Sequence, residues 1–506
     1  MRKRFTPAGI PMLLVGLVLS SVFFSCKKDN PGPGDNGGNG TARSDEDSLK
    51  YLMYNIMQVT YADGGRNSKQ GLPTYYWYTQ VPTLDPFSSN YPKAEDLLTT
   101  MISYPKQDGK NLDRYSFLDR TGDLANKLQN GIIEKVAGDG TGDLGMEVTY
   151  ALDNANRTHL VVLYADKNSP AGQAGVQRGW EITAINGNTN ISYDGANGPN
   201  TQRVNAALTA SSASFTFSTP GGATSKDLSA GSYNVNPVLF DTVYNVGGKQ
   251  VGYFVLYTFS SVTNTSGAAT PTKTVLDQVF NNFRSRGITE LIADFRYNTG
   301  GAVTTAQYLD NIIAPATARG KVMYNYIYND KISQNLAATG LPASIKFDNT
   351  PGGLGLNHVF FVTGGETASA SELTLNNLKP YMNVKLVGDT TYGKPVGFFN
   401  YTISDYPNGK ENYLGDLYAI NFETKNANQQ GGYYNGIAPD ATARDVVSYP
   451  WGDQRDEHLS KIFAYINGGS FREAGTELRT STNPSLRVNI PGSIPSRQFN
   501  GMIDFR

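Results

Sequence analysis

The chain has 506 residues, enough for roughly two to four domains with a large buried core. Its 43 Lys and Arg residues balance 44 Asp and Glu residues, and a net charge of −1 without a basic stripe gives no support for nucleic-acid binding. Charged residues make up only 17% of the chain, and Gly, Asn, Ser, Thr and Tyr are plentiful, which is more typical of a loop-rich exported protein than of a charged cytosolic one.

The N-terminus has the pattern of a secretion signal. Arg2–Arg4 is basic, and Ile10–Phe24 is apolar but shorter than the about 20 apolar residues that a membrane-spanning helix needs. Cys26, the only cysteine, stands where bacterial lipoprotein signals place their lipidated residue, so residues 1–25 are predicted to be a lipoprotein signal peptide. The alternative is an ordinary cleaved signal with an incidental cysteine. With no second cysteine, the fold cannot depend on internal disulfides.

Residues 26–43 are polar and rich in Gly, Pro and Asn, which predicts a flexible tether. A lipid on Cys26 followed by a tether would anchor the rest of the protein to a membrane. Lys27 is not the Asp that usually retains lipoproteins at the inner membrane, so the outer membrane is favoured. The sequence leaves open whether the protein faces the periplasm or the cell surface, and it leaves the oligomeric state unknown.

Residues 44–135 are predicted to be a small helical N-terminal domain that caps the rest. Ser44 and Asp47 resemble a helix-capping pair, and apolar residues then recur at helical spacing through Met57. Ala94–Met101 has the pattern of a second short helix.

From residue 138 the pattern becomes that of β-structure. Alternating apolar residues predict a strand at Met146–Tyr150, and Leu160–Leu163 predicts a second strand. The phrase Ser169–Gly187, which opens with Ser-Pro-Ala and closes with Ile-Asn-Gly, resembles the PDZ domains of bacterial proteases. Residues 138–235 are therefore predicted to be a PDZ domain.

The likeness to PDZ domains implies a peptide-binding loop at Leu144, Gly145 and Met146. The backbone N–H groups of such a loop can hold a peptide C-terminus while the peptide adds a strand to the edge of the sheet. Two alternatives stay open: the domain gates the rest of the protein without binding peptides, or the Gly-rich run before Met146 is a plain surface turn.

Residues 236–468 alternate strands with helices, which predicts an α/β core with right-handed crossovers. The predicted strands are Val251–Leu256, Ile288–Phe295, His358–Val362 and Val384–Val387, and the predicted helices cover 275–283 and 369–378. Residues 469–506 are polar and are predicted to be a loosely ordered tail.

Ser369 follows the turn Gly364–Gly365 and begins a predicted helix. A helix N-terminus presents unpaired N–H groups, so an oxyanion formed beside Ser369 would be stabilised there, with the N–H of Ala370 as a donor. The second donor is predicted at Gly300 or Gly301, where the absence of a side chain lets the backbone approach a substrate closely.

Lys394 lies on the far side of the same helix–strand unit from Ser369. The chain has only three histidines, and a lysine that is held neutral can serve as the base for a serine nucleophile. The neighbours of Lys394 are small or apolar, which suits a desolvated amine whose pKa must fall from about 10.4. These residues predict Ser-Lys peptidase chemistry, with Glu372 supporting the start of the helix.

The chain resembles the C-terminal processing (tail-specific) peptidase family. The shared motifs are the PDZ phrase, Asp294–Gly301, Thr367–Glu372, Gly388–Lys394 and Gly436–Asp440. In that family the nucleophile stands three residues before a glutamate and 25 before the lysine, which here gives Ser369, Glu372 and Lys394.

The resemblance implies an α/β catalytic core of the ClpP/crotonase type, with an inserted PDZ domain and a small helical N-terminal domain. It also implies endoproteolysis through an acyl-enzyme, no metal or other cofactor, and polypeptide substrates that are unfolded or engaged near their C-termini. One position departs from the family pattern: many members have a Gln four residues after the lysine to orient it, and this chain has Phe398.

Other motifs in the chain match the patterns of different sites only in part. Gly388–Pro395 nearly spells a phosphate-binding loop, but Pro395 removes the hydroxyl that would bind magnesium. Ser103–Lys106 has the Ser-x-x-Lys spacing, but its proline breaks the helix that this spacing needs. His159, His358 and His458 are not in metal-ligand spacing. A Ser-His-Asp triad stays open.

A rival interpretation belongs to a different class of protein. The chain could be a surface lipoprotein that binds peptides or glycans on an inactive peptidase fold. Phe398, in place of the orienting Gln, favours this rival. The intact pair Ser369 and Lys394 favours an active enzyme, since a binding module needs no such pair.

Overall fold

The computed structural model describes most of the chain after the predicted tether. The described residues are 44–60, 81–107, 110–111, 113–133, 143–349, 353–471, 486–488, 494 and 501–505. The predicted signal peptide, the tether and Cys26 lie outside them. No helix within the described ranges is long and apolar enough to cross a membrane.

A six-stranded sheet forms the centre of the molecule, with the strand order β11-β12-β13-β17-β18-β21. Only β11 and β12 pair antiparallel, and every other neighbouring pair is parallel. The strands are β11 (Val238–Val246), β12 (Lys249–Leu256), β13 (Glu290–Asp294), β17 (His358–Thr363), β18 (Asn383–Gly388) and β21 (Ala441–Thr442). The four strands predicted for the core correspond to β12, β13, β17 and β18, whose long apolar runs reflect burial on both faces.

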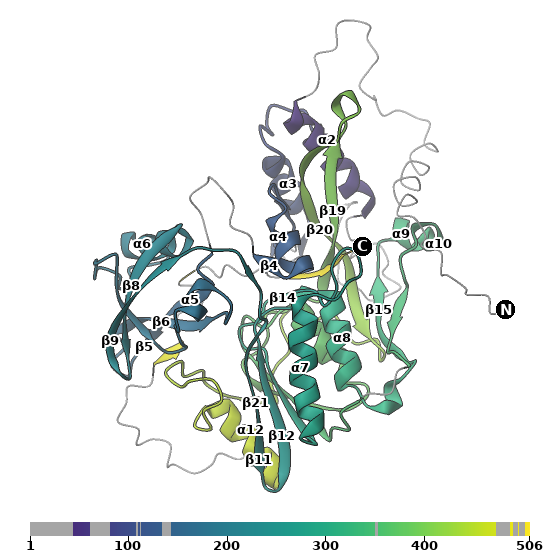
Figure 1. Cartoon of the computed structure of the whole chain (residues 1–506). Coiled ribbons are helices and arrows are strands. Elements are labelled where there is room, and N and C mark those ends of the chain that lie inside the picture. The colour runs from purple at the N-terminus through teal and green to yellow at the C-terminus, as the bar shows by residue number, and fades with distance from the viewer. Residues whose placement is uncertain are drawn as a thin grey trace, which may run out of the picture.

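Helices cover both faces of this sheet (Figure 1). Leu291 and Ala293 of β13 pack in one apolar cluster with α7 (Pro271–Ser285), α8 (Val303–Ile313) and α11 (Ala370–Leu378). Ile292 points the opposite way, because successive strand residues alternate between faces, and packs in a cluster with α12 (Glu457–Gly468).

A second, seven-stranded sheet lies beyond α8 and α11, which it helps to bury. Its strand order is β14-β23-β19-β20-β15-β16, and β3 also pairs with β20. The strands are β14 (Gly300–Ala302), β23 (Gly501–Asp504), β19 (Val396–Asp405), β20 (Asn412–Asn426), β15 (Val322–Ile327), β16 (Ser344–Lys346) and β3 (Phe117–Asp119). Short helices join this layer: η3 (Ala316–Ala318), α9 (Asp330–Gln334), α10 (Leu336–Thr339) and η4 (Pro407–Gly409).

The end of the chain departs from the predicted loose tail. Residues Gly501–Asp504 form β23, which lies between β14 and β19 and is buried along its whole length. Four residues are too few for a period-two pattern to stand out in a polar segment, and the strand is stabilised by pairing on both of its edges.

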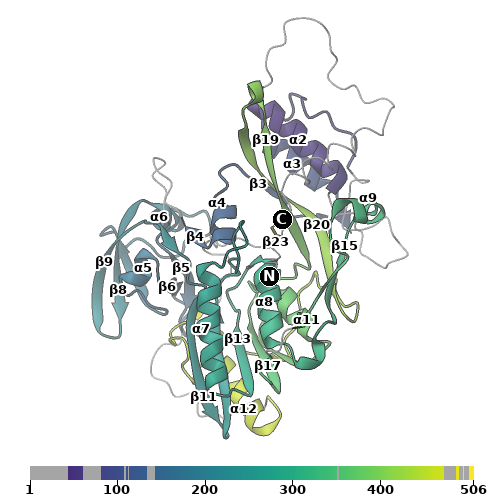
Figure 2. The same ribbon diagram turned by 45° about the vertical axis from the view of Figure 1, so that its right-hand side comes forward.

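The predicted N-terminal helices are confirmed as α2 (Asp45–Thr60) and α3 (Ala94–Ser103). The N–H of Asp47 donates to Ser44 Oγ at 3.1 Å, as the predicted cap requires. Apolar residues of α2 and α3 share one cluster with residues of β19 and β20, so these helices pack on the long hairpin (Figure 2). The region is less purely helical than predicted, since it also contains β1 (Lys106–Gln107), β2 (Lys110–Asn111), β3, α4 (Asp123–Ala125), the π-helix η2 (Asn126–Asn130) and β4 (Ile132–Ile133).

A third sheet forms a separate lobe, at the left of Figure 1, over the region predicted to be a PDZ domain. Its strand order is β22-β5-β6-β7-β8-β9. The elements are β5 (Met146–Leu152), β6 (Thr158–Ala165), α5 (Pro170–Gln173), β7 (Glu181–Ile185), α6 (Pro199–Thr209), β8 (Ser212–Thr219), β9 (Gly222–Ser229), β10 (Tyr233–Asn234), which pairs with β4, and β22 (Arg487–Val488). The two predicted strands are confirmed as β5 and β6, while the assignment to the PDZ class stays a prediction.

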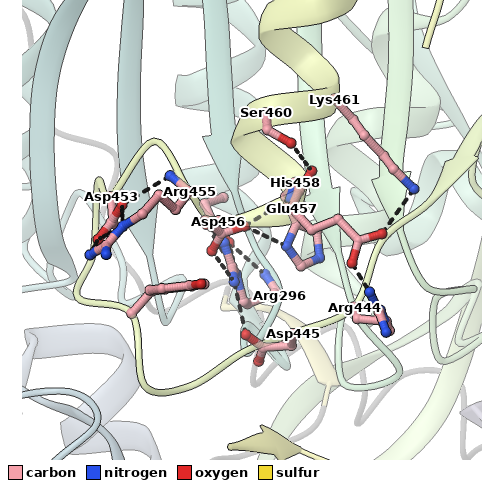
Figure 3. A network of polar contacts seen from close by, with 12 residues as sticks. Arg296, Arg444, Asp445, Asp453, Arg455, Asp456, Glu457, His458, Ser460 and Lys461 are labelled. Atoms are coloured by element: carbon pink, nitrogen blue, oxygen red, sulfur yellow. Dashed lines mark hydrogen bonds and ion pairs between the residues drawn. The ribbon is translucent and has the colours of Figure 1, made fainter. Parts of the chain in front are cut away.

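A buried network of charges ties the lobes together. Arg296, just after β13, donates to Asp294 at 2.7 Å and to Asp445 and Asp456 at 2.9 Å each. Figure 3 shows Arg296 pointing toward Asp445 and Asp456. Arg178, from the third-sheet lobe, donates to the same Asp445 at 2.7 Å. Burial alone would raise the pKa of Asp445, but the charges of Arg178 and Arg296 hold it below its usual value.

We predict that Arg296→Ala lowers the free energy of unfolding by about 3–5 kcal/mol, because it leaves buried carboxylates without their cation. Urea unfolding would measure this loss. The control is Arg444→Ala, whose side chain is 69% exposed and pairs with Glu457, and it should cost less than about 1 kcal/mol. Equal losses for the two variants would contradict a structural role for the network.

Candidate active site

Ser369 lies in a sharp turn between β17, which ends at Thr363, and α11, which begins at Ala370. Its backbone angles are φ 60° and ψ −109°, a conformation that non-glycine residues seldom adopt and that costs about 1–3 kcal/mol. The Ser369 side chain is fully buried, and its Oγ makes no hydrogen bond within the described part of the chain. A strained serine without a hydrogen-bond partner has the features of a reactive group.

The loop that carries the two predicted oxyanion glycines lies beside this turn. Asn298 joins them: its carbonyl accepts from the N–H of Ala368 at 3.1 Å, and its Oδ1 accepts from the N–H of Gly300 at 3.0 Å. Gly300 and Gly301 have φ angles of 110° and 136°, and a Cβ on Gly300 would lie 2.2 Å from the carbonyl oxygen of Gly501. Only glycine fits there, and the Gly300 N–H is already engaged by Asn298.

Glu372 is the centre of the hydrogen-bond network around Ser369. Oε2 of this fully buried carboxyl accepts from the backbone N–H groups of Ser369 and Lys394, both at 2.8 Å. Oε1 accepts from the Thr391 hydroxyl at 2.5 Å and from the Gly393 N–H at 2.8 Å. The two segments predicted to supply nucleophile and base are therefore fixed to one carboxyl group. Burial raises the pKa of Glu372, and these hydrogen bonds act in the opposite direction.

Lys394 is fully buried, as the sequence predicted for a neutral amine. Its Nζ lies 4.5 Å from the centre of the Tyr115 ring and 4.3 Å from that of Phe398. Burial holds the pKa of Lys394 well below its usual value. Phe398, which replaces the orienting Gln, is thus one wall of the lysine site.

Residues 113–115 of the N-terminal region complete the surroundings of Lys394, and sequence reasoning missed them. The negative charge of Asp113 opposes the lowering of the Lys394 pKa, and the positive charge of Arg114 adds to it. The Tyr115 hydroxyl donates to the Gly393 carbonyl at 3.4 Å, beside the lysine. No sequence signal links these residues to a lysine that lies about 280 positions later; only the fold brings them together.

The three histidines lie away from Ser369, and each has a carboxylate as its neighbour. His358 begins β17, at the opposite end of that strand from the Ser369 turn, and its Nδ1 is 2.9 Å from Glu290. His159 and His458 have carboxylate neighbours at 2.7 Å and 2.8 Å. In the described ranges, no histidine hydrogen-bonds to Ser369, and no cluster of three or more His, Cys, Asp or Glu residues could hold a metal ion.

The predicted peptide-binding loop directly precedes β5. Leu144 and Met146 are buried, and the carbonyls of Leu144 and Gly145 accept from Ala171 at 3.0 Å and from Asp166 at 2.9 Å. A Cβ on Gly145 would lie 1.9 Å from the Cβ of Ser169, so the loop is packed tightly against the start of α5.

Comparison with known proteins found matches of family and of fold. Residues 250–443 match peptidase family S41. A structure from Bacteroides fragilis, assigned to the S41 proteases, is 21% identical and covers 86% of this chain and 99% of its own, with a TM-score of 0.59. The photosystem II D1 C-terminal processing protease is 19% identical over 79% of this chain and 93% of its own, with a TM-score of 0.42. Mature CPAF complexed with lactacystin is 11% identical over 83% and 98%, also with a TM-score of 0.42. The search of curated proteins found no match.

The fold is mixed α/β, and the match of residues 250–443 to peptidase family S41 supports a serine peptidase. The part of the chain that matches this family is its core. The family match supports the predicted resemblance to the C-terminal processing peptidases.

We predict that Glu372→Gln lowers the free energy of unfolding by about 1–3 kcal/mol, because the amide NH₂ would face two of the donors that now reach a carboxyl oxygen. Urea unfolding would measure the change. The exposed Glu411→Gln is the matched control and should leave stability unchanged within about 0.5 kcal/mol. A Glu372→Gln variant as stable as the control would show that the hydrogen bonds to Glu372 do not support the turn.

Proposed function

We propose that the protein is a serine endopeptidase that works through an acyl-enzyme, with Ser369 as nucleophile and Lys394 as general base. The observation that carries this proposal is the shared carboxyl of Glu372. One oxygen of Glu372 accepts from the N–H groups of both Ser369 and Lys394 at 2.8 Å, so the two backbone nitrogens are no farther apart than twice that distance.

In this proposal Lys394 takes the proton of the Ser369 hydroxyl as Oγ attacks the carbonyl carbon of a peptide bond. The N–H of Ala370, at the N-terminus of α11, and that of Gly301 stabilise the oxyanion of the tetrahedral intermediate, because the N–H of Gly300 already donates to Asn298. Lys394 then returns the proton to the leaving amine, which departs and leaves an acyl group on Ser369. Water, deprotonated by Lys394, attacks the ester and releases the second product and the free serine.

The lysine is oriented without the Gln that many family members use. The rings of Tyr115 and Phe398 lie within 4.5 Å of Nζ and restrict where the amine can point. The Asp113 carboxylate favours the protonated amine, so it would stabilise the ammonium that forms as Ser369 attacks. Asp113 and Tyr115 thus take over the positioning role in this proposal, and they come from the N-terminal region.

The proposed substrates are polypeptides that are unfolded or exposed at their C-termini. This substrate class follows from the resemblance to the C-terminal processing peptidases. The proposed location is the cell envelope, with a lipid on Cys26 anchoring the protein to the outer membrane and the PDZ lobe presenting or gating substrate.

Two observations favour the rival function, an inactive surface lipoprotein that binds peptides or glycans. Phe398 replaces the orienting Gln, and the nucleophile Ser369 is inaccessible in this structure. A serine-reactive phosphonate separates the two proposals, because only an activated Ser369 reacts with it. Labelling that Ser369→Ala abolishes supports the enzyme, and the absence of any labelling supports the rival.

We predict that the purified protein cleaves casein and that Ser369→Ala abolishes cleavage. Lys394→Ala should lower kcat/KM by about 10²–10⁴-fold, the usual contribution of a general base. Lys410→Ala, an exposed lysine, is the control and should keep full activity. If Lys394→Ala also keeps full activity while Ser369→Ala does not, Lys394 is not the base and the histidines return as candidates.

We predict that kcat/KM rises with pH. The midpoint of this rising limb should lie well below about 10.4, the pKa of a free lysine. The reason is that only neutral Lys394 can accept the serine proton, and burial lowers its pKa. The pH profile of casein or peptide cleavage measures the limb.

The charges around Lys394 predict the direction in which a substitution moves the rising limb of the pH profile. Asp113 and Glu372 raise the pKa of Lys394 and Arg114 lowers it, so Asp113→Asn should lower it further and move the limb to lower pH. Asp85→Asn, which removes an exposed carboxylate, should leave the limb in place. A limb that stays fixed, or moves to higher pH, in Asp113→Asn would contradict the assignment of Lys394 as base.

A further inference from the structure

The outer edge of the third sheet is covered by the chain's own C-terminal segment. β5 pairs with β6 along one edge, and along the other edge it pairs, in the described part of the chain, only with β22. The pairing is antiparallel and joins Leu152 to Arg487 and Ala151 to Val488. An added antiparallel strand at an exposed sheet edge is the geometry in which one chain recognises another as a peptide.

Two buried apolar residues anchor the segment on either side of β22. Leu486 is 8% exposed and its carbonyl accepts from the Val447 N–H at 2.9 Å, which ties it to the core. Ile494 is 7% exposed and packs in the apolar cluster of the third-sheet lobe. That cluster includes Leu144 and Met146 of the predicted peptide-binding loop and Val204 and Leu208 of α6.

The position of Ile494 agrees with the direction of β22. Because the pair is antiparallel, β22 runs in the direction of the N-terminal end of β5, which begins at Met146. The side chain of Ile494 is then found in the same cluster as Met146. An aliphatic side chain beside the loop at 144–146, preceded by a strand on β5, is the arrangement of a bound peptide.

We propose that the edge of β5 is a peptide-binding surface whose resident occupant is this chain's own segment, held by β22 and Ile494. An incoming extended polypeptide with an aliphatic residue at the position of Ile494 must displace that segment. Among the described residues, β22 pairs with β5 through two. Because the occupant is intramolecular, it competes at an effective concentration on the order of millimolar. Binding of peptide does not depend on the proposed catalysis; only the step from bound peptide to cleaved substrate does.

The same segment leads directly to the candidate active site. Seven residues after Ile494, Gly501 begins β23, which pairs with Gly300 of β14 and, through Ile503, with Phe398 of β19. Displacement of Ile494 therefore acts on a strand that borders both the oxyanion loop and the lysine site. The occupied edge and the catalytic centre are joined by a short stretch of one chain.

A disulfide lock tests the proposal on the full chain. Cys26→Ser removes the only thiol, and Leu152→Cys with Arg487→Cys places two cysteines at directly opposed positions. Opposed Cα atoms in antiparallel strands lie about 4.5–5.5 Å apart, within the range that a disulfide spans. The probe is a fluorescent peptide that copies residues 485–494, and its binding is followed by anisotropy. A peptide with Asp in place of its last Ile is the control ligand.

We expect the reduced protein to bind the probe and the oxidised protein to bind it at least about tenfold more weakly, since the lock keeps the occupant in place. Ile494→Asp should bind the probe at least about tenfold more tightly than the parent, because its own segment competes less well. Ala223→Asp, on the exposed far-edge strand β9 of the same sheet, should bind like the parent.

Equal binding by the oxidised and reduced forms would overturn the proposal, and so would Ile494→Asp binding no more tightly than Ala223→Asp. Cleavage of casein is measured on the same proteins. Loss of cleavage with the binding differences intact would count against the proposed peptidase function and not against the occupied edge, and the Ser369→Ala variant should show the same binding differences.

Discussion

The arrangement of this site depends on one buried carboxyl group. Glu372 lies on α11, where every residue is buried between the two sheets of the core, so its oxygens have no access to water. Such a group is tolerated only if protein donors replace the water, and four donors do so. These donors come from the turn before the helix and from the loop before β19. Burial of Glu372 is unfavourable by itself, but its hydrogen bonds hold the Ser369 turn close to the loop before β19.

The strain at Ser369 follows from the same constraint. A serine at φ 60° would relax if its N–H were free to turn, and the hydrogen bond from that N–H to Glu372 opposes the relaxation. The Asn298 carbonyl, which accepts from the N–H of Ala368, holds the other side of the turn. The strained conformation of Ser369 is therefore held in place by its neighbours. The free energy that offsets this strain comes from the packing of the layers around α11.

The sequence predicted the parallel core well and the second sheet poorly, for physical reasons. Strands β12, β13, β17 and β18 are apolar on both faces and are punctuated by glycine, so they stand out in the sequence. The partners of the hairpin formed by β19 and β20 come from residues 117–119, 322–327 and 501–504, and no local pattern in the sequence records such distant pairing. The same limit explains why Ser369, Glu372 and Lys394 were found by spacing while Asp113 and Tyr115 were not. Spacing along the chain identifies a group, but only the fold identifies its neighbours.

The placement of β23 gives the C-terminal segment a second consequence. β14 has Gly300 and Gly301, and its partner along the sheet is β23. The oxyanion loop is therefore supported on one side by residues that follow the segment lying on β5, and on the other by Asn298. The support from Asn298 lies within the core, whereas the support from β23 belongs to the chain end, which also supplies β22 on the third-sheet lobe. Because β19, which follows Lys394, pairs with the other edge of β23, this strand borders both the glycines at 300 and 301 and the strand that follows Lys394.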